Sequence, residues 1–109
     1  MSQTKSIPCT IFDHVVWFVQ AGDRSSRRAE ILHGECLLLF TSLDAVHSFL
    51  DTCEDRDSAG LKPAIFSRNR KGFGERAREA ARSGVVGALF DPLTDCGEAP
   101  FLRFAKIAV

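Results

Sequence analysis

The sequence predicts an α/β fold of the α+β type, a two-layer sandwich in which a mixed five-stranded sheet carries two helices on one face. Short runs rich in β-branched and aromatic residues alternate with two stretches of helical periodicity, in the order β-β-α-β-α-β-β. Each helix connects two strands, and crossovers of this kind are right-handed in nearly every protein. We therefore expect both helices on the same face of the sheet.

Two strands are predicted in the first part of the chain. Residues 11–20 are rich in β-branched and aromatic side chains and are followed by the turn sequence Ala-Gly-Asp. Residues 35–42 form a continuous apolar run, as in a strand covered on both faces. The polar stretch 21–34 between them is expected to be a long hairpin loop or a short helix.

Two helices follow from apolar residues at helical spacing. The first is predicted over residues 43–54, with the hydroxyl of Thr41 or Ser42 as its N-cap. The second begins near Phe73 and ends at Gly84. Its inward face is a stripe of small side chains, which allows close packing on a sheet: Ala77, Ala80 and Ala81.

Three further strands complete the predicted sheet. Residues 62–67 form a short strand, and Pro63 is expected at its first position, where no ladder donor is needed. Residues 85–90 and 100–109 are the fourth and fifth strands. Because 109 residues are the usual size of one domain, we expect residues 1–109 to form a single domain with a flexible N-terminus at 1–9.

Charge is balanced overall but separated along the chain. The protein has 14 basic and 14 acidic residues, so no global field attracts it to nucleic acid or to an anionic membrane. Residues 44–57 carry a net charge of −4, whereas residues 68–84 carry +4, which predicts two oppositely charged surfaces. No apolar run approaches the length of a membrane span or signal peptide, which indicates a cytoplasmic protein without a membrane partner.

The segment 68–84 is the closest approach to a chemical motif. Its Gly72, Gly74 and Ala77 fit the G-x-G-x-x-G/A pattern of dinucleotide-binding turns. That pattern needs its first glycine directly after the strand, whereas Gly72 comes five residues after Ser67. We therefore prefer a plain connection between strand and helix.

Phosphate contact without the dinucleotide pattern is a second interpretation of the same segment. Basic residues precede a predicted helix N-terminus, and Phe73 could stack on a base. A solvated helix face explains the same charges, because glutamates lie three residues before arginines on the predicted helix. The candidate ligand-binding or partner-binding residues are Arg68, Arg70, Lys71, Arg76 and Asp91.

The cysteine and histidine pattern predicts neither a metal site nor a catalytic site. The four cysteines form no C-x-x-C pair, and most lie in apolar runs where a reduced thiol behaves as a small hydrophobe. The sequence His33-Gly34-Glu35 has the H-x-E spacing of zinc deaminases but lacks their P-C-x-x-C element. We expect no metal, no cofactor and no catalytic residue.

The strands at 11–20 and 35–42 look apolar on both sides, whereas two helices on one face leave the other uncovered. The 21–34 loop, the 91–99 loop or a partner subunit could cover the second face. The uncovered face predicts a homo-oligomer or a complex with another protein, and nucleic acid is not expected as a partner.

Three segments together resemble the N-terminal domain of SseB-like proteins, which are linked to enhanced serine sensitivity. They are the strand around Trp17-Phe18-Val19, the strand, cap and helix LLLFTSLDAVHSFL, and the helix end and strand SGVVGALFDP. The likeness spans residues 12–93, and that family often has Asn where this chain has Asp91. The resemblance implies a small α/β domain with a binding or regulatory role and transfers no catalytic residue.

The sequence therefore favours a non-enzymatic cytoplasmic module that acts by binding another protein. The binding surface is expected on the uncovered sheet face or on an edge strand. The alternative is a module that binds a phosphate-containing ligand or nucleic acid through residues 68–76.

Overall fold

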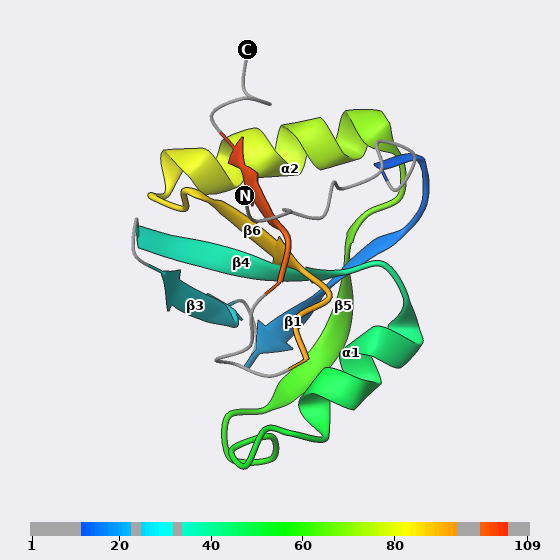
Figure 1. Cartoon of the computed structure of the whole chain (residues 1–109), viewed down its shortest axis with the longest axis vertical. Helices are drawn as coiled ribbons and strands as arrows, with labels where there is room; N and C mark the ends of the chain where they lie inside the picture. Colours follow the sequence, from blue (N-terminus) through cyan, green and yellow to red (C-terminus); the bar gives the residue numbers. More distant parts are fainter. Residues whose placement is uncertain (1–11, 23–24, 32–33, 94–98, 105–109) are drawn as a thin grey trace, which may run out of the picture.

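The computed structural model describes residues 12–22, 25–31, 34–93 and 99–104. This part of the chain forms seven strands and two helices, and Figure 1 shows their arrangement. In chain order they are β1 (Val16–Ala21), β2 (Ser25–Ser26), β3 (Arg28–Ile31), β4 (Gly34–Phe40), α1 (Leu43–Leu50), β5 (Leu61–Ser67), α2 (Arg70–Arg82), β6 (Gly87–Phe90) and β7 (Phe101–Arg103).

The strands form one mixed sheet, as the sequence predicts. Its main order is β5-β1-β4-β6-β7, with β2 paired to β1 and β3 paired to β4. The pairs β5-β1, β1-β4 and β6-β7 are antiparallel, and β4-β6 is parallel. Strands β4, β5 and β6 therefore all run in the same direction, as expected for strands joined by helical crossovers.

The segment between β1 and β4 is neither of the two structures predicted for residues 21–34. It contains two short strands, because β1 and β4 pair with each other only at Trp17 and Phe18. Farther along, β2 pairs with the end of β1 and β3 pairs with the start of β4. The Arg27 N–H also donates to the carbonyl of Val19, at 2.8 Å. Strands β2 and β3 thus supply hydrogen bonds where β1 and β4 separate.

The two helices lie on opposite faces of the sheet, so the prediction that both lie on one face is wrong. Alternate residues of β4 point to opposite faces and reveal the arrangement. Leu37 and Leu39 belong to the apolar cluster that contains Phe73 of α2, whereas Leu38 and Phe40 belong to the cluster that contains Phe49 of α1. In Figure 1, α2 crosses the top of the sheet and α1 lies below it.

Strand order explains this arrangement. From β4 the chain moves past β1 to β5, and from β5 it returns past β1 and β4 to β6. Two right-handed crossovers that travel in opposite directions along a sheet place their helices on opposite faces. The prediction of one face assumed that both crossovers travel in the same direction.

The core is consequently divided into two layers by the sheet. The layer under α2 contains Phe66, Phe73, Ala77 and Phe90, and the layer over α1 contains Val46, Phe49 and Leu50. Helix α1 covers the face that the sequence argument left open. The apolar character of β4 on both sides therefore needs no partner subunit to explain it.

Both helices begin at side-chain caps. The hydroxyl of Ser42 accepts a hydrogen bond from the Ala45 N–H, and the Asn69 side chain accepts one from the Gly72 N–H. Helix α1 ends at Leu50, earlier than predicted, and α2 begins one turn before the predicted start at Phe73. No helix among the described residues is long and apolar enough to cross a membrane.

The strand boundaries differ from the predictions mainly at the ends of the chain. Strand β1 begins at Val16 instead of residue 11. Pro63 is the third residue of β5, not the first as the sequence predicts. It is tolerated there because β5 is an edge strand that pairs only with β1 among the described strands. The predicted flexible segment 1–9 and the end of the predicted strand 100–109 lie outside the described residues.

Candidate functional site

The structure places the five predicted binding residues in three different environments. Arg68, Arg70 and Lys71 lie at the exposed start of α2. Arg76 lies farther along the same helix, and its guanidinium lies over the rings of Phe18 and Phe66. Asp91 follows β6, and both of its carboxylate oxygens contact Thr41.

Asp91 has a structural role in this arrangement. Its backbone adopts a φ of 53°, which is uncommon for a residue other than glycine. The Thr41 N–H donates to one carboxylate oxygen at 2.9 Å, and the Thr41 hydroxyl donates to the other at 2.7 Å. The carboxylate therefore links the end of β6 to the residue that follows β4.

The start of α2 is partly occupied by the chain that precedes β1. Arg70 forms an ion pair with Asp13 at 3.2 Å, and its guanidinium lies 6.0 Å from the centre of the Phe12 ring. The Phe12 ring packs on Phe73, with centroids 4.5 Å apart. Arg70 is thus already engaged within the molecule, whereas Arg68 and Lys71 are exposed and form no ion pair with any described residue.

Gly72 and Gly74 do not form a phosphate-binding turn. Both lie inside α2, and neither has a positive φ. In a dinucleotide-binding protein the first glycine lies in the turn between strand and helix, where the backbone approaches the pyrophosphate. Here Asn69 caps the helix instead, which agrees with the preferred interpretation of the sequence.

A hollow lies between α2 and the sheet, and we call it the α2 hollow. It has a volume of about 220 Å³. Strands β1, β4 and β5 provide an apolar floor, and α2 and the β2-β3 segment provide the walls. The lining residues are Phe18, Ser26, Arg28, Leu37, Phe66, Arg76, Glu79, Ala80 and Ser83.

Arg76 is the distinctive residue of the α2 hollow. Its guanidinium lies 5.9 Å from the centre of the Phe18 ring and 5.3 Å from that of Phe66. Contacts of this kind attract a cation to the face of the ring. Among the described residues, Arg76 has no ion pair and no hydrogen bond from its side chain. Two aromatic rings therefore position a cation whose N–H donors stay available.

The arginine on the opposite wall of the α2 hollow, Arg28, is neutralised by a neighbouring glutamate. Arg28 pairs with Leu37 across β3 and β4, so both side chains point to the α2 side of the sheet. The Arg28 guanidinium forms an ion pair with Glu35 at 3.3 Å. Of the two arginines that line the hollow, only Arg76 is therefore unpaired within the described chain.

Sequence reasoning identified Arg76 but missed the residues that give it a role. Phe18 and Phe66 come from strands far apart in the sequence, and each was assigned to the core by its strand pattern. They meet because β1 pairs with β5 and because α2 passes over both strands. No local pattern in the sequence carries this information.

The described thiols are buried. Cys36 lies on β4, and Cys53 lies beyond the end of α1, where its Sγ donates to the carbonyl of Phe49 at 3.5 Å. Burial raises the pKa of the Cys36 thiol above its ordinary value of 9.0, and a hydrogen bond with the Ala29 backbone partly offsets this. Within the described ranges, no three His, Cys, Asp or Glu side chains come together as metal ligands. Cys9, His33 and Cys96 lie outside those ranges.

The fold and the hollow together define a small α/β protein with a depression of about 220 Å³ over one face of its sheet. No family model, no curated protein and no solved structure matches the chain. The resemblance to SseB-like domains therefore stays a prediction.

Proposed function

We propose that the chain is a non-enzymatic binding module for another protein, and that the α2 hollow receives an apolar side chain of that partner beside a carboxylate. The apolar part of the ligand would lie on Phe18, Leu37 and Phe66. The carboxylate would accept hydrogen bonds from the guanidinium of Arg76. This arrangement makes use of the apolar floor and of the one unpaired arginine at the hollow.

The observation that carries the proposal is the position of Arg76 over two aromatic rings. A free arginine side chain loses rotamer freedom when it binds an anion, and this loss weakens binding. The rings of Phe18 and Phe66 restrict Arg76 before any ligand arrives. A planar guanidinium held in this way favours a carboxylate, which can accept two parallel hydrogen bonds.

Edge-strand pairing is a weaker explanation of partner binding. The exposed edge of the sheet at β5 carries Lys62 and Pro63. Lysine and proline on an edge strand oppose the addition of a further strand. We therefore favour the α2 hollow over the β5 edge.

The alternative function, contact with phosphate groups, depends on Arg68 and Lys71 at the start of α2. Both side chains are exposed and near the helix N-terminus, where the backbone favours an anion. The neighbouring Arg70 is engaged by Asp13. This interpretation therefore rests on two surface cations without a formed cavity.

A matched pair of small probes tests the proposal. N-acetylleucine carries an apolar side chain and a carboxylate, and N-acetylleucinamide lacks only the charge. At about 0.3 kcal/mol per non-hydrogen atom, a ligand of this size should bind with a Kd of about 1 mM. Titration of ¹⁵N-labelled protein, followed by NMR, should shift the amide signals of Phe18, Arg76 and Ala80 with the acid and much less with the amide.

Two variants make the test specific. Arg76→Gln should abolish the difference between the two probes, whereas Arg82→Gln, on the last turn of α2, should preserve it. Equal shifts with both probes, or shifts outside the hollow, would contradict the proposal. If inorganic phosphate instead shifts the signals of Arg68 and Lys71, and the effect falls with added salt, the alternative function is favoured.

We also propose a cytoplasmic location, which fits the buried free thiols of Cys36 and Cys53. Fractionation of cells that produce the tagged protein, with thiol labelling before and after unfolding, tests this location. Recovery outside the cytoplasm with oxidised thiols would contradict it.

A further inference from the structure

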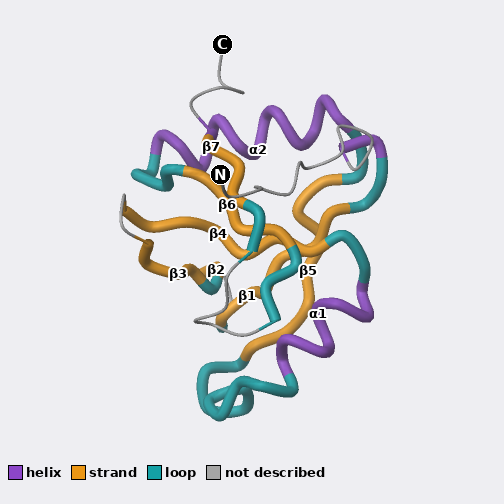
Figure 2. The backbone as a smooth tube through the Cα atoms, viewed as in Figure 1, coloured by secondary structure: helices purple, strands orange, loops and turns teal. Residues whose placement is uncertain are grey.

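The two oppositely charged segments of the chain lie on opposite sides of the molecule. Residues 44–57 include α1 and the loop after it, and residues 68–84 include α2. Figure 1 shows α2 across the top and α1 at the lower right, and Figure 2 shows the loop after α1 at the bottom. Because the helices cover opposite faces of the sheet, the net charges of −4 and +4 are separated by its thickness.

The charges within each segment are only partly compensated inside the molecule. Asp51 pairs with Arg56 and Asp55 pairs with Arg27, whereas other exposed acids have no ion pair among the described residues. We define the acidic surface by these acids, which are Asp44, Glu54 and Asp57. We define the basic surface by the exposed cations of the second segment that likewise lack an ion pair among the described residues: Arg68, Lys71, Arg76 and Arg82.

From this separation we infer that copies of the chain associate head to tail, with the acidic surface of one copy against the basic surface of the next. The net charge of the whole chain is zero, so copies do not repel one another at long range. Complementary surfaces then orient the encounter. The occupant of each charged surface is a second copy of this chain.

The geometry makes this association different from a two-fold dimer. A two-fold axis through either surface would bring that surface against its own copy, acidic against acidic or basic against basic. Unlike surfaces on opposite sides of a molecule form a heterologous contact instead. Such contacts produce closed rings or open chains, so the assemblies should grow with protein concentration.

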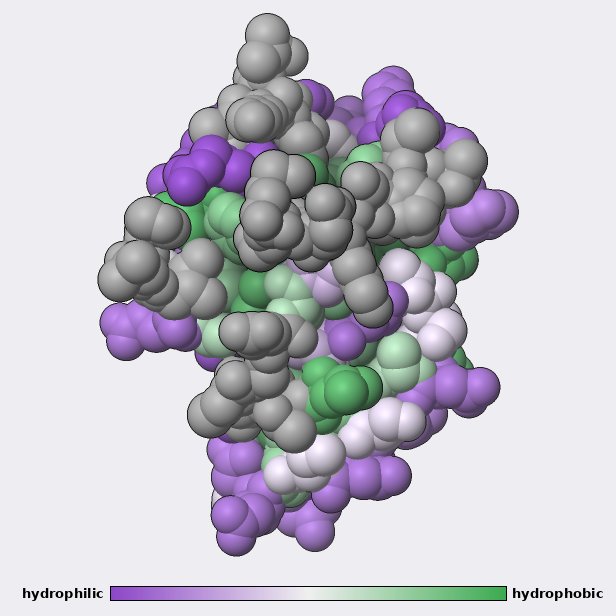
Figure 3. Space-filling view, in the orientation of Figure 1, coloured by the Kyte–Doolittle hydropathy of each residue, from purple (hydrophilic) through white to green (hydrophobic). Residues whose placement is uncertain are grey.

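An apolar residue adjoins the acidic surface. Leu43 begins α1, is 40 % exposed, and precedes Asp44. Charge pairs in water add specificity more than affinity, so burial of an apolar side chain would strengthen the contact. Figure 3 shows hydrophilic residues at the bottom of the molecule, where the loop after α1 lies.

Sedimentation velocity at several salt concentrations gives the first test. The association constant should fall at least about tenfold between about 0.1 M and about 1 M NaCl, because the Debye length shortens from about 10 Å to about 3 Å. Leu43→Ser should weaken association about fivefold at every salt concentration without changing the salt dependence. Protein that is monomeric at low salt, or association that strengthens with salt, would overturn the inference.

Charge reversal gives the decisive test. One triple variant is Asp44→Lys, Glu54→Lys, Asp57→Lys, and the other is Arg68→Glu, Lys71→Glu, Arg82→Glu. Each replacement changes the charge by two units, so each triple variant reverses the sign of its surface. Either variant alone should be monomeric, and an equimolar mixture of the two should assemble.

Controls separate folding from association. Circular dichroism should show that both triple variants keep the wild-type fold. The control Glu30→Lys with Arg103→Glu changes two exposed residues outside both surfaces and keeps the net charge, so it should associate like wild type. If a triple variant unfolds, single replacements at Glu54 and Lys71 should each weaken association in the same direction. A mixture that stays monomeric overturns the inference without affecting the α2 hollow, which the leucine probes test separately.

Discussion

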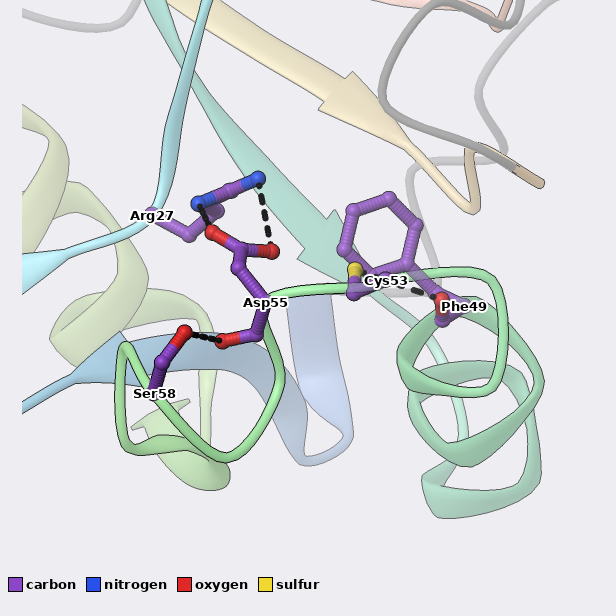
Figure 4. Close-up of polar contacts among 5 residues, drawn as sticks. All are labelled: Arg27, Phe49, Cys53, Asp55 and Ser58. Carbon is purple, nitrogen blue, oxygen red and sulfur yellow. Dashed lines mark hydrogen bonds and ion pairs between the residues drawn. The ribbon is translucent and has the colours of Figure 1, made fainter.

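The guanidinium of Arg27 contacts both carboxylate oxygens of Asp55, at 2.8 and 3.5 Å, across 28 residues of chain (Figure 4). The pair connects the segment between β2 and β3 to the loop after α1. The backbone carbonyl of Asp55 also accepts hydrogen bonds from the Ser58 hydroxyl and the Ala59 N–H. Asp55 is therefore one of the points at which this loop is joined to the sheet.

A double-mutant cycle with Arg27→Ala and Asp55→Ala should show a coupling of up to about 1 kcal/mol in the free energy of unfolding. The value is limited because the two side chains are 25 % and 42 % exposed. The more exposed pair Arg56 and Asp51 is the control and should couple by about 0.3 kcal/mol or less. Urea unfolding provides the measurement, and equal coupling in both pairs would contradict the special position of Asp55.

Replacing Phe73 with Ala should cost about 3–5 kcal/mol of stability, because the ring is 2 % exposed and its removal leaves a cavity. Its ring contacts those of Phe12, Phe66 and Phe90, which join α2 to the sheet. Lys71→Ala on the exposed side of α2 should change stability by less than about 0.5 kcal/mol. Chemical unfolding should show this contrast in the free energy of unfolding. An ordinary substitution costs about 1 kcal/mol, so a smaller loss for Phe73→Ala would show that α2 packs elsewhere.

Two glycines should respond to alanine in opposite ways. Gly74 lies inside α2, and a Cβ there would meet only Arg78 Nη1, at 3.5 Å, so Gly74→Ala should stabilise the protein by about 0.5–1 kcal/mol. At Gly87 a Cβ would collide with the Leu102 carbonyl and lie 2.6 Å from the Phe101 ring. Gly87→Ala should therefore displace β7 and cost about 1–3 kcal/mol. Melting temperatures that change in the same direction would be inconsistent with this register.

A series at Asp91 should separate its hydrogen bonds from its backbone conformation. Asp91→Asn retains an acceptor for the Thr41 N–H and tolerates positive φ, so it should be nearly neutral. Asp91→Gly keeps the backbone conformation but loses both hydrogen bonds. Asp91→Ala loses both hydrogen bonds and adds backbone strain, so it should lower the free energy of unfolding by about 1–3 kcal/mol. Thermal unfolding should give the order wild type, Asn, Gly, Ala, and an alanine variant as stable as the asparagine variant would refute this role.

The Cys36 thiol should make stability fall at alkaline pH. Its pKa is raised in the folded state by burial, so its contribution is complete below the ordinary value of 9.0 and is lost as pH rises toward the folded pKa. The chain has no tyrosine, which removes the commonest competing titration. We expect the free energy of unfolding to fall less in Cys36→Ala than in the wild type between about pH 8 and about pH 10. This range covers about one unit on each side of the ordinary cysteine pKa. An identical fall in both proteins would place the responsible group elsewhere.

The local parts of the fold could be predicted because they depend on neighbours in sequence. The inward face of α2 follows from the spacing of Phe73 and Ala77, and the start of α1 follows from the hydroxyl before Leu43. The short strands β2 and β3 could not be predicted, because segments of two and four residues are too short to establish a strand pattern of their own. They exist only because β1 and β4 separate beside them.

The sequence by itself determined both helices and five of the seven described strands, which side of α2 is apolar, and that opposite charges occupy different segments. Only the tertiary structure decided that the helices cover opposite faces, that Arg76 meets Phe18 and Phe66, and that Asp91 bonds to Thr41. The physical reason is strand order. A strand's own residues determine which of its faces are apolar, but its neighbours are selected by hydrogen bonds between segments far apart in the chain.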